Sequence, residues 1–115
     1  MTAELVNNTT IEGTDMHTHA AVLRGAGEPL TVEPLALRGV ARGEVAVDIK
    51  AVGVCHSDLH LVAGDWPVDE PLVGGHEASG IVTEVGDGVD DVQVGDHVVL
   101  SWFVACRRCR NCLSG

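Results

Sequence analysis

The chain has 115 residues, of which 45% are hydrophobic and 21% charged, and its net charge is −10. This length and composition are typical of one globular domain and exclude a disordered chain. Because only seven residues are Lys or Arg, we expect no nucleic-acid-binding surface. Aromatic residues make up 3% of the chain, so we expect a core of Val, Leu, Ile and Ala.

The first segment carries no signal for secretion. "MTAELVNNTT" has neither a basic nor an apolar region, and no stretch of the chain approaches the ~20 apolar residues of a membrane span. We therefore expect a cytoplasmic protein with no membrane partner, in which four reduced cysteines favour metal binding over disulfides. Residues 1–17 are polar and predicted to form a flexible leader. His17 and His19 are interpreted as a mobile, unpaired histidine pair.

Short strands separated by turns are predicted from residue 20 onward. "AAVLRG" and "EPLTVEPL" come first, and then Val45, Val47, Ile49 and Ala51 alternate with other residues, which predicts a strand with one buried face. "SGIVTEVG" and "GDHVVLSW" repeat the strand signal. This spacing, with 14 glycines for tight corners, predicts a mainly β fold, either a small barrel or a sandwich.

One short helix interrupts this pattern. "HSDLHLVAGD", residues 56–65, is predicted to form one or two helical turns, with Ser57 or Asp58 near the start. No G-x-G-x-x-G segment follows a strand, so we expect no dinucleotide-binding unit within these residues.

Two stretches, "GVCHSDLH" and "GGHEASG", carry a first set of candidate metal ligands. Cys55 and His76 are zinc-type ligands that lie 21 positions apart, so only the fold can bring them together. Asp58 is a candidate to orient a metal-bound His76, and Glu77 is a possible displacing ligand. By themselves, Cys55 and His76 also fit an ordinary core residue and a turn residue.

Two further residues near Cys55 suit proton transfer. Ser57 offers a hydroxyl and His60 an imidazole, which together can pass a proton to solvent. Two zinc ligands beside such a relay suit the chemistry of alcohols. Trp66 and Trp102 either line part of the pocket or serve in ordinary packing.

The second candidate metal site is the C-x2-C-x2-C run formed by Cys106, Cys109 and Cys112. Thiolates at this spacing can surround one tetrahedral zinc ion. An iron–sulfur cluster is the alternative, because the same spacing begins a bacterial ferredoxin motif. Its next cysteine would lie past Gly115, so the sequence leaves this alternative open.

The motifs "VCHSDLH", "GGHEASGIVTEVGDGV", "VGDHVVL" and "ACRRCRNC" occur in the order found in zinc-containing medium-chain alcohol dehydrogenases. The resemblance runs from about residue 20 to residue 115. It implies that residues 18–115 form the amino-terminal part of the catalytic domain, a GroES-like β-barrel with short helical turns. "GGHE" and "GDHVVLS" are similar to bacterial members, including nitrosodimethylaniline-dependent types.

The resemblance also implies roles for the first set of residues. Cys55 and His76 would be two ligands of the catalytic zinc, with Glu77 as an alternating ligand. Ser57 and His60 would form the proton relay. The activity implied is oxidation of small-molecule alcohols to aldehydes or ketones by hydride transfer to NAD or NADP.

The remaining implied roles concern the cofactor and the second zinc. His56 would meet the cofactor pyrophosphate, and Cys106, Cys109 and Cys112 would hold the structural zinc. The third catalytic ligand, the fourth loop cysteine and the Rossmann domain are expected beyond Gly115. We therefore expect an incomplete chain that is inactive alone and holds zinc weakly, and full-length members that are homo-oligomers.

Two other interpretations of the sequence differ in class. The chain could be a stand-alone zinc-binding module without catalysis. A GroES-like structural or chaperone-type domain is a weaker alternative, because such a domain does not need Ser57, His60 or the cysteine loop.

Overall fold

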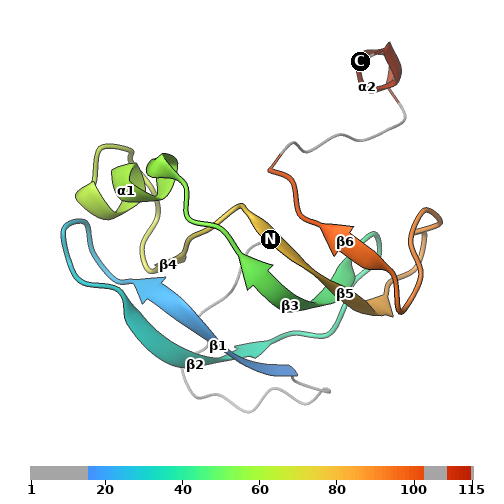
Figure 1. The fold of residues 1–115 in the computed structure, drawn as a ribbon, viewed down its shortest axis with the longest axis horizontal. Helices are drawn as coiled ribbons and strands as arrows, with labels where there is room; N and C mark the ends of the chain where they lie inside the picture. Colours follow the sequence, from blue (N-terminus) through green and yellow to red (C-terminus); the bar gives the residue numbers. More distant parts are fainter. Residues whose placement is uncertain (1–15, 103–108, 115) are drawn as a thin grey trace.

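The computed structural model describes residues 16–102 and 109–114. Most of the leader expected at residues 1–17 lies outside these ranges, but its last two residues, Met16 and His17, belong to the first strand. The elements, in chain order, are β1 (Met16–Leu23), β2 (Thr31–Leu37), β3 (Val45–Val52), α1 (His56–Ala63), β4 (Leu72–Val73), β5 (Ala78–Val85), β6 (His97–Val99) and α2 (Arg110–Ser114). The mainly β prediction is confirmed (Figure 1).

The strands form two antiparallel sheets of three strands each. Sheet A has the order β2-β1-β4, and sheet B has the order β3-β5-β6 (Figure 1). β1 pairs with β2 along most of its length and with β4 only at Val22 and Leu23. Sheet B carries the long β3–β5 pairing, whose ends position the candidate site.

The alternation predicted for β3 does not appear in its burial, which is partial from Val45 to Val47 and lost from Asp48 to Val52. Val45 and Val47 are partly buried, whereas Ile49 and Ala51 are exposed, with 44% of Ile49 accessible to solvent. The pairing of β3 with β5 shifts register at two places along the strand. The prediction of one continuous buried face is therefore wrong for the second half of the strand.

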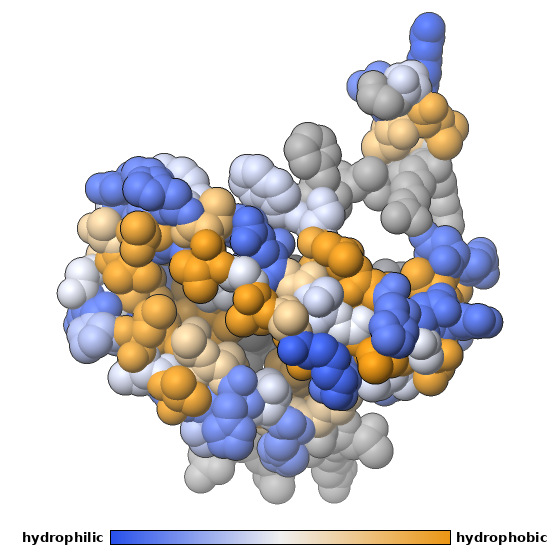
Figure 2. All heavy atoms as spheres, viewed as in Figure 1, coloured by the Kyte–Doolittle hydropathy of each residue, from blue (hydrophilic) through white to orange (hydrophobic). Residues whose placement is uncertain are grey.

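The core is small and aliphatic, as the composition predicts. In the described ranges, the buried hydrophobic residues are Val22, Leu23, Leu35 and Val82. Other large apolar residues are exposed, among them Val52 (72%), Val54 (82%) and Val99 (82%). Figure 2 shows apolar side chains gathered on one face of the molecule. Exposed apolar surface of this kind is typical of a face that another polypeptide segment covers.

Helix α1 is held at both ends by its caps. Cys55 has an extended backbone at the N-cap position, and the Asp58 carboxylate accepts a hydrogen bond from the Cys55 N–H at 2.8 Å. Gly64 ends the helix in the left-handed conformation, with φ at 78°. The short helix predicted within residues 56–65 is thus confirmed. Among the described residues, no helix is long and apolar enough to cross a membrane.

Candidate metal centre

The β3–β5 pairing brings together the two stretches that carry the first ligand set. Val52, at the end of β3, pairs with Ala78, at the start of β5. Cys55 follows β3 by three residues, and His76 and Glu77 immediately precede β5. Because the strands are antiparallel, the end of one and the start of the other lie at the same edge of sheet B.

Cys55, His76 and Glu77 form a cluster whose ligand atoms all lie within 4.8 Å of one another. Cys55 and His76 are partly buried, and Glu77 is exposed. One thiolate, one imidazole and one carboxylate are donors that zinc accepts. Ligand atoms around a tetrahedral zinc lie roughly 3.5 Å apart, given bonds of about 2.0–2.3 Å. Small side-chain adjustments therefore suffice for the cluster to fit a zinc ion.

Asp58 lies next to this cluster and is close to both Cys55 and His76. While its Oδ2 accepts the Cys55 N–H, its Oδ1 lies 3.6 Å from His76 Nδ1. Oδ1 is buried and has no hydrogen-bond partner in residues 16–102 and 109–114. A small movement would let it accept a hydrogen from Nδ1, which leaves Nε2 as the lone-pair donor for a metal.

Ser57 lies beside the Nε2 atom of His76. Its Oγ is 3.3 Å from His76 Nε2. Hydrogen bonds from the Ser57 hydroxyl and N–H, followed by one from His76, lower the pKa of the Cys55 thiol. The hydrogen bond with Cys55, followed by the charge of Asp58, raises the pKa of His76. The lowered pKa favours the thiolate, which is the form of cysteine that binds metals. The raised pKa favours protonated His76, which would have to lose its proton before Nε2 could bind a metal.

His60 lies on the same helix as Ser57 but has different partners. Its Nδ1 is 2.7 Å from Asp65 Oδ2, its ring stacks on Trp66 at 5.2 Å between centroids, and the ring of His56 meets it edge-on at 5.1 Å. No hydrogen bond joins Ser57 directly to His60 in the described part of the chain. Asp65 was not among the predicted site residues, although its position in "GDW" directly after the helix was an available signal.

Both tryptophans considered in the sequence contact a histidine of the site. Trp66 stacks on His60 and is 44% exposed. Trp102 lies 5.5 Å from the His76 ring, tilted by 31°, and is 69% exposed. This exposure excludes packing in the core and leaves a role in a pocket or at an interface as the two interpretations.

The second candidate metal site is described in part. Cys106 lies outside the described residues. The Sγ atoms of Cys109 and Cys112 are 3.3 Å apart, and the Leu113 N–H bonds to the Cys109 carbonyl at 3.1 Å. A single helical turn thus brings the two thiols together, in a segment that lies away from both sheets (Figure 1).

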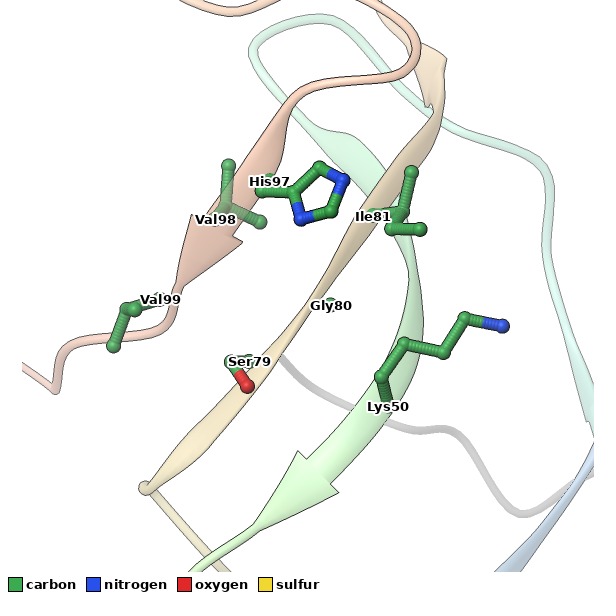
Figure 3. A pocket seen from close by; sticks show the side chains of 7 residues that line it. All are labelled: Lys50, Ser79, Gly80, Ile81, His97, Val98 and Val99. Atoms are coloured by element: carbon green, nitrogen blue, oxygen red, sulfur yellow. The ribbon is translucent and has the colours of Figure 1, made fainter.

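A separate hollow of about 270 Å³ lies over sheet B (Figure 3). Its lining residues are Lys50, Ser79, Gly80, Ile81, His97, Val98 and Val99. None of them belongs to the ligand cluster, and the Lys50 ammonium already bonds to Asp48 at 2.5 Å. This hollow is therefore not the candidate site.

Comparison with known families agrees with this geometry. Residues 41–115 match the alcohol dehydrogenase GroES-like domain family. The chain belongs to this family. The matched residues include α1, β4 and all three strands of sheet B, whereas β1 and β2 precede them.

Several related proteins and structures are named alcohol dehydrogenases. The chain is 49% identical over 100 residues to an NDMA-dependent alcohol dehydrogenase of Amycolatopsis methanolica, and 48% identical over 99 residues to an alcohol dehydrogenase of Geobacillus stearothermophilus. These matches cover 87% and 84% of this chain but 27% and 29% of those proteins. Benzyl alcohol dehydrogenase of Acinetobacter calcoaceticus aligns with a TM-score of 0.80 and 40% identity, over 87% of this chain and 27% of that one. The chain thus spans about a quarter of the length of these relatives.

Proposed function

We propose that the chain supplies the metal-binding and proton-transferring part of a zinc-dependent alcohol dehydrogenase, which oxidises alcohols to aldehydes or ketones by hydride transfer to NAD or NADP. The observation that carries this proposal is the convergence of Cys55, His76 and Glu77. Relatives named alcohol dehydrogenases support the reaction class. Because the chain spans about a quarter of their length, the reaction belongs to a longer polypeptide, and we expect these 115 residues alone to be inactive.

In this proposal, Cys55 and His76 hold a catalytic zinc, and Glu77 is a ligand that alternates with others. Bound there, zinc would supply the Lewis acidity that makes an alcohol hydroxyl more acidic. Asp58 Oδ1 lies 3.6 Å from His76 Nδ1, and a small movement would let it accept the Nδ1 hydrogen and leave Nε2 free to bind the ion. The lowered pKa of Cys55 prepares the thiolate for this role.

Ser57 and His60 then carry the proton of the alcohol toward solvent. The Ser57 hydroxyl lies beside His76 Nε2, so it is placed to accept a proton from a molecule bound at the cluster. Ser57 does not bond directly to His60, so the proton transfer in this proposal needs a bridging group, such as a water molecule or a hydroxyl group of the cofactor. His56 is exposed next to His60, where an imidazole can meet the pyrophosphate of the nicotinamide cofactor.

The cysteine loop has a structural role in this proposal. Cys106, Cys109 and Cys112 hold a second zinc, and the 3.3 Å between the last two thiols supports a shared ligand site. Metal analysis of purified protein separates zinc from the iron–sulfur alternative. Bound iron with visible absorbance would favour an iron–sulfur centre at these cysteines. We further propose a small-molecule alcohol or aldehyde substrate and a homo-oligomeric full-length protein.

A chimera tests the proposed reaction. Residues 16–115 replace the corresponding segment of the Geobacillus stearothermophilus alcohol dehydrogenase, and alcohol oxidation is measured with NAD and with NADP. We expect alcohol-dependent cofactor reduction. Ser57→Ala in the chimera should lower kcat by about a hundredfold or more, as expected for the loss of a group that transfers a proton.

The control for this chimera is Ser79→Ala, which changes a serine of the separate hollow and should leave kcat unchanged. A chimera that folds and binds zinc at Cys55 but oxidises no alcohol would contradict the dehydrogenase proposal. That result would favour the stand-alone zinc-binding module.

A further inference from the structure

Gly53 lies where the two ligand-bearing segments meet. Its N–H donates a hydrogen bond to the Glu77 carbonyl at 2.8 Å. A β-carbon placed on Gly53 would lie 3.1 Å from Glu77 Cβ and 3.3 Å from Glu77 Cδ, and it would overlap with Oε2. The Glu77 carboxylate therefore occupies the space that a side chain at position 53 would need.

The need for glycine at this position comes from space rather than from backbone conformation. Gly64 and Gly75 have positive φ values of 78° and 105°, a region that L-residues with side chains rarely adopt. Gly53 is not among the glycines with positive φ. Its backbone conformation is therefore compatible with alanine. The β-carbon of an alanine would instead clash with the side chain of Glu77.

The position of the Glu77 carboxylate matters because of its charge. A carboxylate oxygen of Glu77 lies within 4.8 Å of the ligand atoms of Cys55 and His76. A carboxylate held beside a thiolate is unfavourable until a cation lies between them. The cluster thus places a thiol, a carboxylate and an imidazole where one divalent cation could bind all three.

We propose that Gly53 is a positioning residue for metal binding, because the absence of its side chain lets Glu77 keep a carboxylate oxygen within reach of Cys55 and His76. This inference rests on the proposed metal centre. A β-carbon at position 53 would turn the flexible end of Glu77 away from the cluster and remove one of its three donors.

The test measures cobalt(II) binding by the full chain. Cys106, Cys109 and Cys112 are replaced by serine, so that Cys55 is the only thiol left and thiolate-to-cobalt charge transfer reports the cluster alone. Gly53→Ala should weaken cobalt binding by about tenfold to a hundredfold, the range found when groups that support a ligand are changed. Gly39→Ala is the matched control, because nothing lies within 4 Å of a β-carbon at that position and its φ is not positive.

A double variant shows whether the effect passes through Glu77. In a Glu77→Ala background, Gly53→Ala should change the cobalt(II) affinity by no more than about twofold, because the side chain through which it acts is already absent. Circular dichroism confirms that each variant is folded. An equal loss of affinity with and without Glu77, or a loss of fold that Glu77→Ala does not relieve, would overturn the inference.

The remaining outcomes separate this inference from the proposed function. If the parent chain shows no charge transfer that depends on Cys55, the metal centre itself is wrong. If the parent binds cobalt and Gly53→Ala binds it equally well, only the positioning role of Gly53 is wrong.

Discussion

The ligand cluster and the cysteine loop reach similar ligand distances by different routes. Cys55 and His76 lie 21 positions apart, and the pairing of β3 with β5 brings them together. Cys109 and Cys112 lie three positions apart, and one helical turn places their sulfurs 3.3 Å from each other. Metal binding at the cluster therefore depends on sheet B, whereas the loop carries its ligands within a few residues of chain.

The largest effect is expected from a change within the cluster. His76→Ala removes the imidazole and leaves Cys55 and Glu77, so cobalt binding at the cluster should fall by more than about a hundredfold. The loop should keep its own thiolate-to-cobalt charge transfer. Titration of the full chain with cobalt(II) measures both signals, and Cys55→Ser identifies which band belongs to the cluster.

Denaturant should separate the two sites next. In urea, the cluster should lose its metal together with sheet B, because unfolding separates Cys55 from His76. The loop should retain metal at urea concentrations beyond this transition, since its cysteines stay close in sequence. Circular dichroism and the charge-transfer band are followed together. Simultaneous loss of metal from both sites would contradict the distinction between them.

Asp58 contributes a smaller effect through two separate contacts. Asp58→Ala removes the bond to the Cys55 N–H, which should destabilise the start of α1 by about 1 kcal/mol. It also removes the oxygen near His76 Nδ1, so metal affinity should fall by about tenfold. Asp58→Asn is the matched variant: its amide oxygen can still accept from Cys55, but its negative charge is lost. It should keep the stability, measured by urea unfolding, and still lose metal affinity.

The smallest change concerns the protonation of Cys55. Ser57 supplies the largest contribution that lowers the pKa of this thiol, so Ser57→Ala should raise that pKa. Only the thiolate reacts with iodoacetamide, and a raised pKa therefore moves the midpoint of the alkylation rate to higher pH. The measurement uses metal-free chain with the three loop cysteines replaced by serine. An unchanged or lower midpoint would show that Ser57 does not stabilise the thiolate.

Several features of the fold followed from local patterns in the sequence. The alternation at Val45 and Val47 predicted a strand, and "HSDLHLVAGD" predicted a short helix, because side-chain periodicity and capping are properties of neighbouring residues. The same pattern was wrong at Ile49 and Ala51. Whether a strand face is covered depends on segments packed against it, which local periodicity does not report.

In the candidate site, too, local sequence identified the residue types, whereas contacts between distant segments could not be predicted. Cys55, His76 and Glu77 were candidates on chemistry and resemblance, and their roles remain predictions, but the structure brings their ligand atoms together. Asp65 was missed because its contact with His60 requires the chain to turn back after α1. The importance of Gly53 was also hidden, since its neighbour Glu77 lies 24 positions away in the sequence.

The sequence by itself determined the strand-rich character, the aliphatic core composition, the short helix and the close spacing of the loop thiols. All of these arise from residues a few positions apart, whose relative placement the covalent chain restricts. Only the tertiary structure decided that a thiol, an imidazole and a carboxylate share one edge of sheet B, and that a glycine leaves room for the carboxylate. Contacts between distant segments depend on strand register, and register is settled by the packing of whole strands.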